Sequence, residues 1–196
     1  MTSTLCFGGS FNPIHNGHLT CARTVAEKSG FKQVLLIPSG TPPHKQAAVD
    51  LAEANDRLAM CHIVAAADPL FHETDIEMRR SGPSYTIDTV RELRGDVSEK
   101  VNWLIGADML NFLPNWREAR RLLDEVNFIV IARPGFVFEW EKLPAEFQVL
   151  KTHVLEAPLV DVSATEIRQR VRAGQPIDSM VPPAVARYIE THRLYK

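Results

Sequence analysis

The sequence predicts an α/β fold built on a doubly wound parallel sheet, with helices on both faces. Three observations lead to this prediction. Unbroken aliphatic and β-branched runs recur at 33–38, 101–105 and 127–132, as is typical of strands buried on both faces. Segments whose apolar residues have helical spacing separate these runs. A strand, a helix and a further strand in succession give a right-handed parallel crossover.

Composition limits the kind of protein. With 196 residues, of which 45% are hydrophobic, the chain can bury a core, and we expect one domain, 1–196. A net charge of -2 argues against a broad phosphate-backbone surface, so we expect no nucleic acid partner. No signal peptide or membrane-spanning apolar run is visible, so we expect no membrane association. Three cysteines without CxxC spacing are typical of reduced core residues in a cytoplasmic protein.

The first predicted unit joins a strand to a helix around residues 4–18, which read TLCFGGSFNPIHNGH. The apolar run at 5–7 has strand character, and apolar residues between 19 and 26 recur at helical spacing. Gly8 and Gly9 in the turn let the backbone approach a ligand closely. A helix that begins there points unpaired amides and the positive end of its dipole at an anion, so we expect a phosphate site.

Two histidines, His15 and His18, stand at the mouth of this helix. Residues three apart can lie on one helix face, so both imidazoles can contact one anion. Zinc is an alternative, but no HExxH motif and no cysteine or carboxylate at ligand spacing accompanies the pair. In a third interpretation the two histidines only cap the helix.

The run at 33–38 predicts the second strand, and the loop 39–45 (SGTPPHK) follows it. This loop emerges at the carboxyl end of the strand, the edge where open α/β sheets bind ligands. It ends in His44 and Lys45, and its position makes it a candidate for lining a ligand site. A mobile surface loop is the alternative.

Helical spacing next predicts a helix at 52–67, and an extended segment at 71–78 follows. A further helix continues through the apolar positions at 87–93. Ser84 or Thr86 is its natural N-cap, and this second helix mouth serves either ordinary capping or ligand binding.

A strand at 101–105 ends in a glycine turn with Gly106 and Asp108. A carboxylate directly after a parallel strand can accept hydrogen bonds from sugar hydroxyls. Alternatively, Asp108 caps the short helix predicted at 109–114. Trp116 follows a Pro-Asn turn, where a half-exposed indole can stack on a flat ring or belong to a satellite core.

The remaining elements follow in order. A helix is predicted at 117–123, a buried strand at 127–132, a loop or short helix at 136–147, a weaker strand at 149–155 and a closing helix within 181–195.

The segment 161–172, DVSATEIRQRVR, predicts another helix start. Ser163 with Glu166 three residues later forms a capping-box pattern. Arg168 lies one turn into this helix, where by itself it would be interpreted as a solvated charge.

Two of these stretches carry a family resemblance. Residues 8–18, GGSFNPIHNGH, resemble the first signature of the HxGH nucleotidyltransferases, whose core is similar to that of class I aminoacyl-tRNA synthetases. Residues 162–168, VSATEIR, resemble the second signature, which grips ATP phosphates. Ala164 departs from a position that is often serine, while Ser163, Thr165 and Arg168 match. The resemblance implies a single Rossmann-like nucleotidyltransferase domain.

Within this superfamily the chain is similar, over nearly its whole length, to the bacterial enzymes that adenylylate nicotinate mononucleotide. The matching segments are PPHK, PSYT, GAD, NW, RPG and the C-terminal VPxxVxxYI..H.LY pattern. The implied reaction transfers AMP from ATP to nicotinate mononucleotide and yields deamido-NAD and pyrophosphate in NAD biosynthesis. Alternatives are a sibling enzyme acting on nicotinamide mononucleotide or phosphopantetheine, and a non-catalytic nucleotide sensor.

The resemblance also implies roles for individual residues. Those implied to bind ATP are Gly8, Gly9, Ser10, Phe11, His15, His18, Gly106, Asp108, Ser163, Thr165 and Arg168. Those implied to bind the acceptor are His44, Lys45, Ser84, Tyr85, Thr86, Trp116 and Arg133. The implied catalytic set is His15, His18, Lys45 and Arg168. No protein-held metal is expected, because Mg²⁺ would be carried by the ATP phosphates. The sequence leaves the oligomeric state open, a homo-oligomer included.

Overall fold

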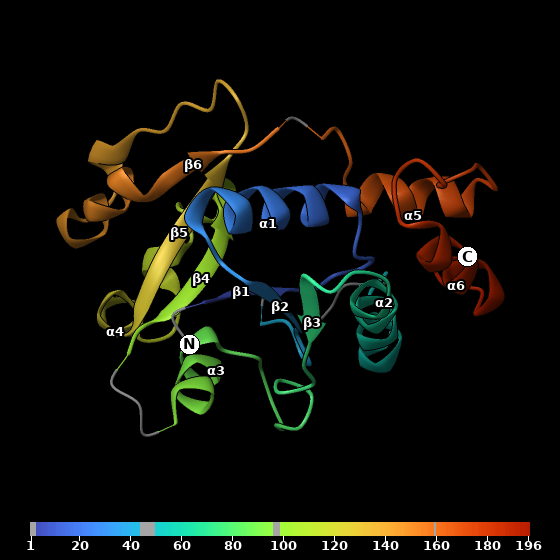
Figure 1. Cartoon of the computed structure of the whole chain (residues 1–196), viewed down its shortest axis with the longest axis horizontal. Coiled ribbons are helices and arrows are strands. Elements are labelled where there is room, and N and C mark those ends of the chain that lie inside the picture. Colours follow the sequence, from blue (N-terminus) through green and yellow to red (C-terminus); the bar gives the residue numbers. More distant parts are fainter. Residues whose placement is uncertain (1–2, 44–49, 96–98, 159) are drawn as a thin grey trace.

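The structure, a computed structural model, describes residues 3–43, 50–95, 99–158 and 160–196. The predictions for His44 and Lys45 lie outside these residues. Within them, parallel strands form one sheet in the order β3-β2-β1-β4-β5-β6 (Figure 1). The strands are β1 (Thr4–Gly9), β2 (Gln33–Pro38), β3 (Phe71–Glu73), β4 (Val101–Gly106), β5 (Val126–Ala132) and β6 (Val154–Glu156).

Helices cover both faces of this sheet, which confirms the predicted fold class. On one face pack α1 (Asn16–Ser29), α2 (Ala54–Ala67), α5 (Ala164–Arg172) and α6 (Pro183–Thr191). On the other pack α3 (Thr86–Arg94), α4 (Ala119–Glu125) and the 3₁₀ helices η1 (Ala107–Met109), η2 (Leu113–Asn115) and η4 (Ala145–His153), with η3 (Trp140–Lys142) at its margin. None of the helices in the described residues is both long and apolar enough to cross a membrane.

The strands separate two hydrophobic clusters because successive side chains point to opposite faces. In β4, Leu104 joins the cluster under α1 and α2, whereas Trp103 and Ile105 join the cluster under α3 and α4. Unbroken apolar runs are therefore needed in the central strands, as the sequence predicts.

The strand order reverses direction between β1 and β4, so their carboxyl ends form the crevice where α/β sheets of this kind bind ligands. β1 ends in Gly8 and Gly9, and β4 ends in Gly106. A Cβ at Gly8 would lie 2.6 Å from the Trp103 ring, so a glycine is required there by close packing between the two strands.

Several predicted elements are wrong in type or extent. The predicted strand at 149–155 is mostly the 3₁₀ helix η4, and β6 spans only Val154–Glu156. Phe147 and Leu150 are both buried at a spacing of three, which fits the 3₁₀ period. The predicted helix at 109–114 is instead two 3₁₀ turns, η1 and η2. Pro114 lacks the amide that a continuous α-helix would use.

Other corrections concern where elements begin and end. The extended segment predicted at 71–78 is a strand only to Glu73, because the amides of Met78 and Arg79 both donate to the Asp75 carbonyl and form a turn. The N-cap of α3 is Tyr85, not Ser84 or Thr86, and no side chain caps it. The helices predicted at 52–67, 117–123 and 181–195 occupy Ala54–Ala67, Ala119–Glu125 and Pro183–Thr191.

Candidate active site

The two histidines form the start of α1. His15 is the N-cap, and its Nδ1 accepts the His18 amide at 3.4 Å. The His18 Nδ1 accepts the His15 amide in return, at 3.3 Å. Their rings stack with centroids 3.6 Å apart. Both histidines therefore cap the helix, and their imidazoles lie together, as joint contact with one anion would require.

This capping fixes which ring nitrogen carries the proton. A nitrogen that accepts a hydrogen bond is unprotonated, so each neutral ring that caps through Nδ1 carries its proton on Nε2. Burial lowers the pKa of His15 to about 4, so this ring is neutral at physiological pH. The fold thus uses Nδ1 and orients Nε2–H as a neutral hydrogen bond donor.

Packing around the rings leaves little freedom. Phe11, which is buried with φ 42°, meets the His18 ring edge to face at 5.3 Å. A Cβ at Gly17 would lie 3.1 Å from the His15 ring and 3.6 Å from the Val162 carbonyl oxygen. The segment that leads into α5 therefore lies directly beside the start of α1.

The N-cap of α5 is Ser163, as predicted. Its hydroxyl oxygen accepts the Glu166 amide at 3.1 Å. The Glu166 carboxylate binds Arg170, one turn later, at 3.0 Å. The amides at the start of α5 thus stand beside those of α1.

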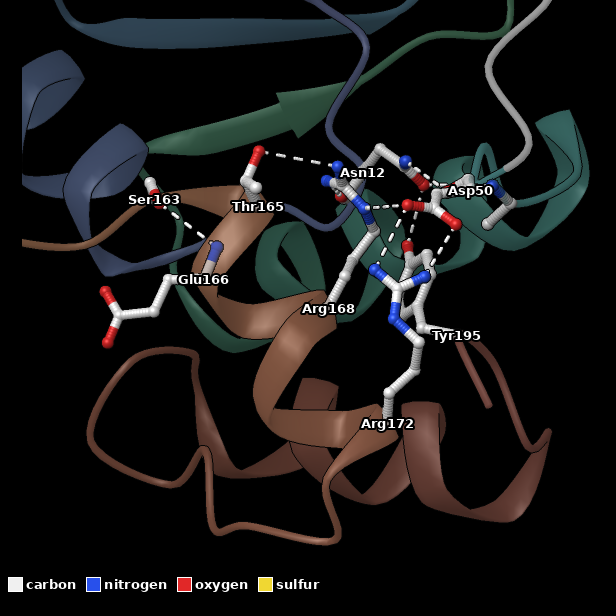
Figure 2. Close-up of polar contacts among 9 residues, drawn as sticks. Asn12, Asp50, Ser163, Thr165, Glu166, Arg168, Arg172 and Tyr195 are labelled. Carbon is white, nitrogen blue, oxygen red and sulfur yellow. Dashed lines mark hydrogen bonds and ion pairs between the residues drawn. The ribbon is translucent and has the colours of Figure 1, made fainter.

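Arg168 connects the second predicted signature to the first. Its Nη1 donates to the Asn12 carbonyl oxygen at 2.9 Å, and its Nη2 donates to the Thr165 hydroxyl at 3.4 Å (Figure 2). Its side chain is only 15% exposed, so the interpretation of Arg168 as a solvated charge is wrong. The Asp50 carboxylate lies 4.0 Å from its Nε and binds Arg172 through two bonds of 2.6 and 3.1 Å.

Arg57 is a site residue that the sequence did not indicate. It is 1% exposed, and it donates hydrogen bonds to four main-chain carbonyls. The acceptors are Ser10 at 3.0 Å, Ser39 at 2.5 Å, Gly40 at 3.0 Å and Ala52 at 2.9 Å. This one cation ties the loop after β1 to the loop after β2. Its position in an ordinary helical pattern carries no signal of that role.

Glu77 is a second buried charged residue beside the loop that follows β2. Its carboxylate is 5% exposed, and burial raises its pKa, while bonds from the Thr89, Ser84 and Ser39 hydroxyls oppose that rise. The Thr89 hydroxyl donates to it at 2.6 Å. A Cβ at Gly40 would lie 2.5 Å from the Glu77 carbonyl oxygen, so the turn packs directly on this backbone.

Ser84, predicted to bind the acceptor, is engaged within the fold. Its hydroxyl oxygen accepts the Thr41 amide at 3.1 Å, and its own amide donates to the Thr41 carbonyl at 2.8 Å. Tyr85 and Thr86 are half-buried at the start of α3. Ser84 therefore holds the loop after β2 against this helix mouth.

Trp116 lies on the same side of the sheet. The guanidinium of its neighbour Arg117 lies 4.8 Å from the centre of the Tyr85 ring, so this segment stands beside the start of α3. Trp116 is half-buried, and its buried Nε1 has no hydrogen bond partner among the described residues. Its packing against the cluster under α3 fits the satellite-core interpretation and leaves part of the ring exposed.

Two predicted site residues are exposed. Asp108 stands in η1 after β4, where a Cβ at Gly106 would collide with its carboxylate. The N-cap of η1 is Gly106, so the interpretation of Asp108 as a helix cap is wrong. Arg133 follows β5. Burial raises the pKa of the Cys21 thiol in α1, and the nearby charge of Arg133 opposes that rise. No group of three or more His, Cys, Asp or Glu side chains able to hold a metal occurs in the described residues.

Comparison with known proteins shows to which class this chain belongs. Residues 6–170 match the cytidylyltransferase-like family, so the chain is an α/β protein of the nucleotidyltransferase class. A protein from Roseiflexus sp. (strain RS-1), named probable nicotinate-nucleotide adenylyltransferase, is 40% identical over 191 residues, 96% of each chain. One from Neisseria meningitidis serogroup B with the same name is 41% identical over 199 residues, 97% of this chain and 96% of the other. The chain therefore belongs to the nicotinate-nucleotide adenylyltransferase family.

A solved structure shares the fold. The Plasmodium falciparum nicotinic acid mononucleotide adenylyltransferase complexed with NaAD superimposes with a TM-score of 0.73 at 20% identity. The match covers 98% of this chain and 96% of that one.

Proposed function

We propose that the protein transfers AMP from ATP to nicotinate mononucleotide and releases pyrophosphate, with deamido-NAD as the product in NAD biosynthesis. The observation that carries this proposal is the contact between the two signatures: Arg168 of α5 binds the carbonyl of Asn12, three residues before the His15 cap. The names of relatives about 40% identical support the choice of acceptor.

The phosphates of ATP would lie between the starts of α1 and α5. Nε2–H of His15 and His18 and the first amides of α1 would donate to oxygens around the α-phosphorus. Arg168 and the start of α5 would bind the β- and γ-phosphates. In line, the 5′-phosphate oxygen of the mononucleotide bonds to the α-phosphorus as the bond to pyrophosphate breaks. The protein supplies alignment and stabilises the charge that develops on the phosphoryl oxygens.

The acceptor would bind at the start of α3, beside Trp116. Tyr85 and Thr86 at this helix start would bind the pyridine carboxylate. The unpaired amides and the positive dipole end of α3 suit a carboxylate better than a neutral carboxamide. Trp116 would stack on the pyridine ring, and Asp108 would contact the adenylate ribose. His44 and Lys45 would contact the attacking 5′-phosphate of the mononucleotide.

Magnesium fits this site as a companion of ATP. The described residues offer no carboxylate cluster that would form a protein cage, so phosphate oxygens and water would hold most of its coordination shell. When bound, Mg²⁺ would neutralise phosphate charge; the protein residues would still set the geometry.

Pyrophosphate release tests the proposal. With Mg²⁺ and ATP, nicotinate mononucleotide should react about 10- to 100-fold faster than nicotinamide mononucleotide, the range expected from losing a hydrogen-bonded charge. Phosphopantetheine should be inert. Equal rates with the two pyridine acceptors, or a preference for phosphopantetheine, would contradict the proposed substrate. ATP binding without any pyrophosphate release would instead favour a nucleotide sensor.

A further inference from the structure

Asn12 is a junction between three distant parts of the chain. It lies between β1 and α1 and is 6% exposed. Its Nδ2 donates to the Asp50 carbonyl at 2.8 Å, and its Oδ1 accepts the Ala52 amide at 2.9 Å. The same Oδ1 accepts the hydroxyl of Tyr195, the penultimate residue, at 2.9 Å (Figure 2). Every polar atom of this side chain is thus engaged.

The main-chain carbonyl of Asn12 is equally committed, because it accepts Nη1 of Arg168 at 2.9 Å. The bond of that guanidinium to Thr165 is longer, at 3.4 Å. Its Nε lies 4.0 Å from the Asp50 carboxylate and has no hydrogen bond partner among the described residues. The Asn12 carbonyl is therefore the shortest anchor that sets the direction of the Arg168 side chain.

The Tyr195 hydroxyl can donate its hydrogen bond to Asn12 without losing its proton. Burial raises the pKa of its phenol, and the nearby charges of Arg168 and Arg57 only partly oppose that rise, so the hydroxyl keeps its proton and stays a donor at neutral pH. Its φ of 64° shows that the chain end turns through the left-handed region to reach this place. Such a conformation in a tyrosine persists only where its contacts support it.

We propose that Tyr195 is a positioning residue for the triphosphate site. Its hydroxyl fixes the Asn12 side chain, and through the Asn12 carbonyl it fixes the Arg168 guanidinium. This inference rests on the proposed function and adds to it a residue near the C-terminus that sets ATP affinity and reactivity. The acceptor site at α3 has no part in this chain of contacts.

Tyr195→Phe is the direct test, because it removes one oxygen atom. Losing one hydrogen bond to a junction of this kind should lower kcat/KM for ATP about five- to tenfold. KM for nicotinate mononucleotide should stay within twofold. Tyr188→Phe is the matched control: its hydroxyl binds Asp56 at 2.9 Å on the neighbouring α2, and its loss should leave both parameters unchanged.

A double-variant cycle separates positioning from general stability. If Tyr195 acts through Arg168, then Tyr195→Phe should have no further effect on ATP binding or turnover in an Arg168→Lys background. Calorimetric titration with a non-hydrolysable ATP analogue provides this comparison even where turnover is too slow to measure, and circular dichroism checks folding.

The inference is overturned if Tyr195→Phe matches the wild type, if both tyrosine variants lose ATP affinity equally, or if the Tyr195 and Arg168 effects add. Absence of pyrophosphate release by the wild type is a separate result: it would refute the proposed function, whereas the analogue titration would still decide the role of Tyr195.

Discussion

His15 and His18 divide their work between two ring atoms. Nδ1 of each caps α1 by accepting the partner's amide, and this bond places the proton of a neutral ring on Nε2. The proposed phosphate contacts through Nε2 would therefore not compete with capping through Nδ1. The burial that lowers the pKa of His15 also keeps its ring neutral, so in the proposed site it would act as a hydrogen bond donor and not as a charge.

Replacing His18 tests its part in the chemistry. Loss of one well-placed donor commonly costs about 10²- to 10³-fold in rate, so His18→Ala should lose most turnover. The missing cap should cost only about 1 kcal/mol of stability. His62→Ala, an exposed histidine on α2, is the control and should keep wild-type turnover. Near-normal pyrophosphate release by His18→Ala would refute the assignment.

The buried His15 should also make folding sensitive to acid. Its folded pKa of about 4 lies below the unfolded value of 6.5, so the unfolded state binds more protons between these values. Stability is full above pH 6.5 and falls as the pH drops towards 4, by at most about 3 kcal/mol. His15→Asn keeps a capping side chain without a titrating ring, and should lose this component.

Urea unfolding of both proteins at pH 7 and pH 4.5 measures that difference. The wild type should lose more free energy of unfolding on acidification than His15→Asn does. An identical loss in both proteins would mean that the His15 ring is not buried as described.

The turn 39–41, which follows β2, is held between two buried charges. Arg57 binds the carbonyls of Ser39 and Gly40. The Glu77 carboxylate accepts the Thr89 hydroxyl at 2.6 Å, and the Ser39 and Ser84 hydroxyls stabilise its charged form. The Ser84 hydroxyl also receives the amide of Thr41. This arrangement fixes the turn against the start of α3, where we propose that the acceptor binds.

Glu77→Gln should weaken the contacts that hold the turn 39–41, with little change in the shape of the side chain. An amide must donate from one of its two positions, so it cannot accept from all the hydroxyls that a carboxylate serves. We expect KM for nicotinate mononucleotide to rise about five- to tenfold, with KM for ATP unchanged. Steady-state kinetics with each substrate varied in turn provides the measurement.

Glu92→Gln is the matched control for this experiment. Glu92 accepts from Arg80 at 2.8 Å, and Arg80 also donates to Thr89, the partner of Glu77. Glu92 is 40% exposed on α3 and pairs with Arg79 and Arg80, which lie outside the turn 39–41, so its loss should leave both KM values unchanged. Equal effects of the two substitutions would show that α3 as a whole was disturbed, and not only the contacts of Glu77 with the turn 39–41.

Elements with strong local patterns could be predicted from the sequence. β2 matches its predicted range, and the Ser163 cap is where its pattern placed it, because both depend on residues near in sequence. The error at 145–153 has a local cause too: the apolar residues Phe147 and Leu150 fit more than one period. Short apolar segments cannot distinguish a weak strand from a 3₁₀ helix.

The contacts that assemble the site could not be predicted in this way. Arg57 looks like any charged residue on a helix, and Tyr195 like a tail residue, until the sheet order brings them to the same loops. The strand order β3-β2-β1-β4-β5-β6 places the start of α1 at the point where the order reverses, and the C-terminal helices return to it. Such convergence depends on contacts over more than 150 residues, as between Asn12 and Arg168.

The central claim is that groups from both ends of the chain bind one triphosphate. A crystal structure of the protein with a non-hydrolysable ATP analogue tests it most directly. We predict that Nε2 of His15 and His18 and the guanidinium of Arg168 all lie within about 3.2 Å of phosphate oxygens of the same nucleotide. A nucleotide bound elsewhere, or one that contacts the histidines while Arg168 stays turned away from it, would contradict the account.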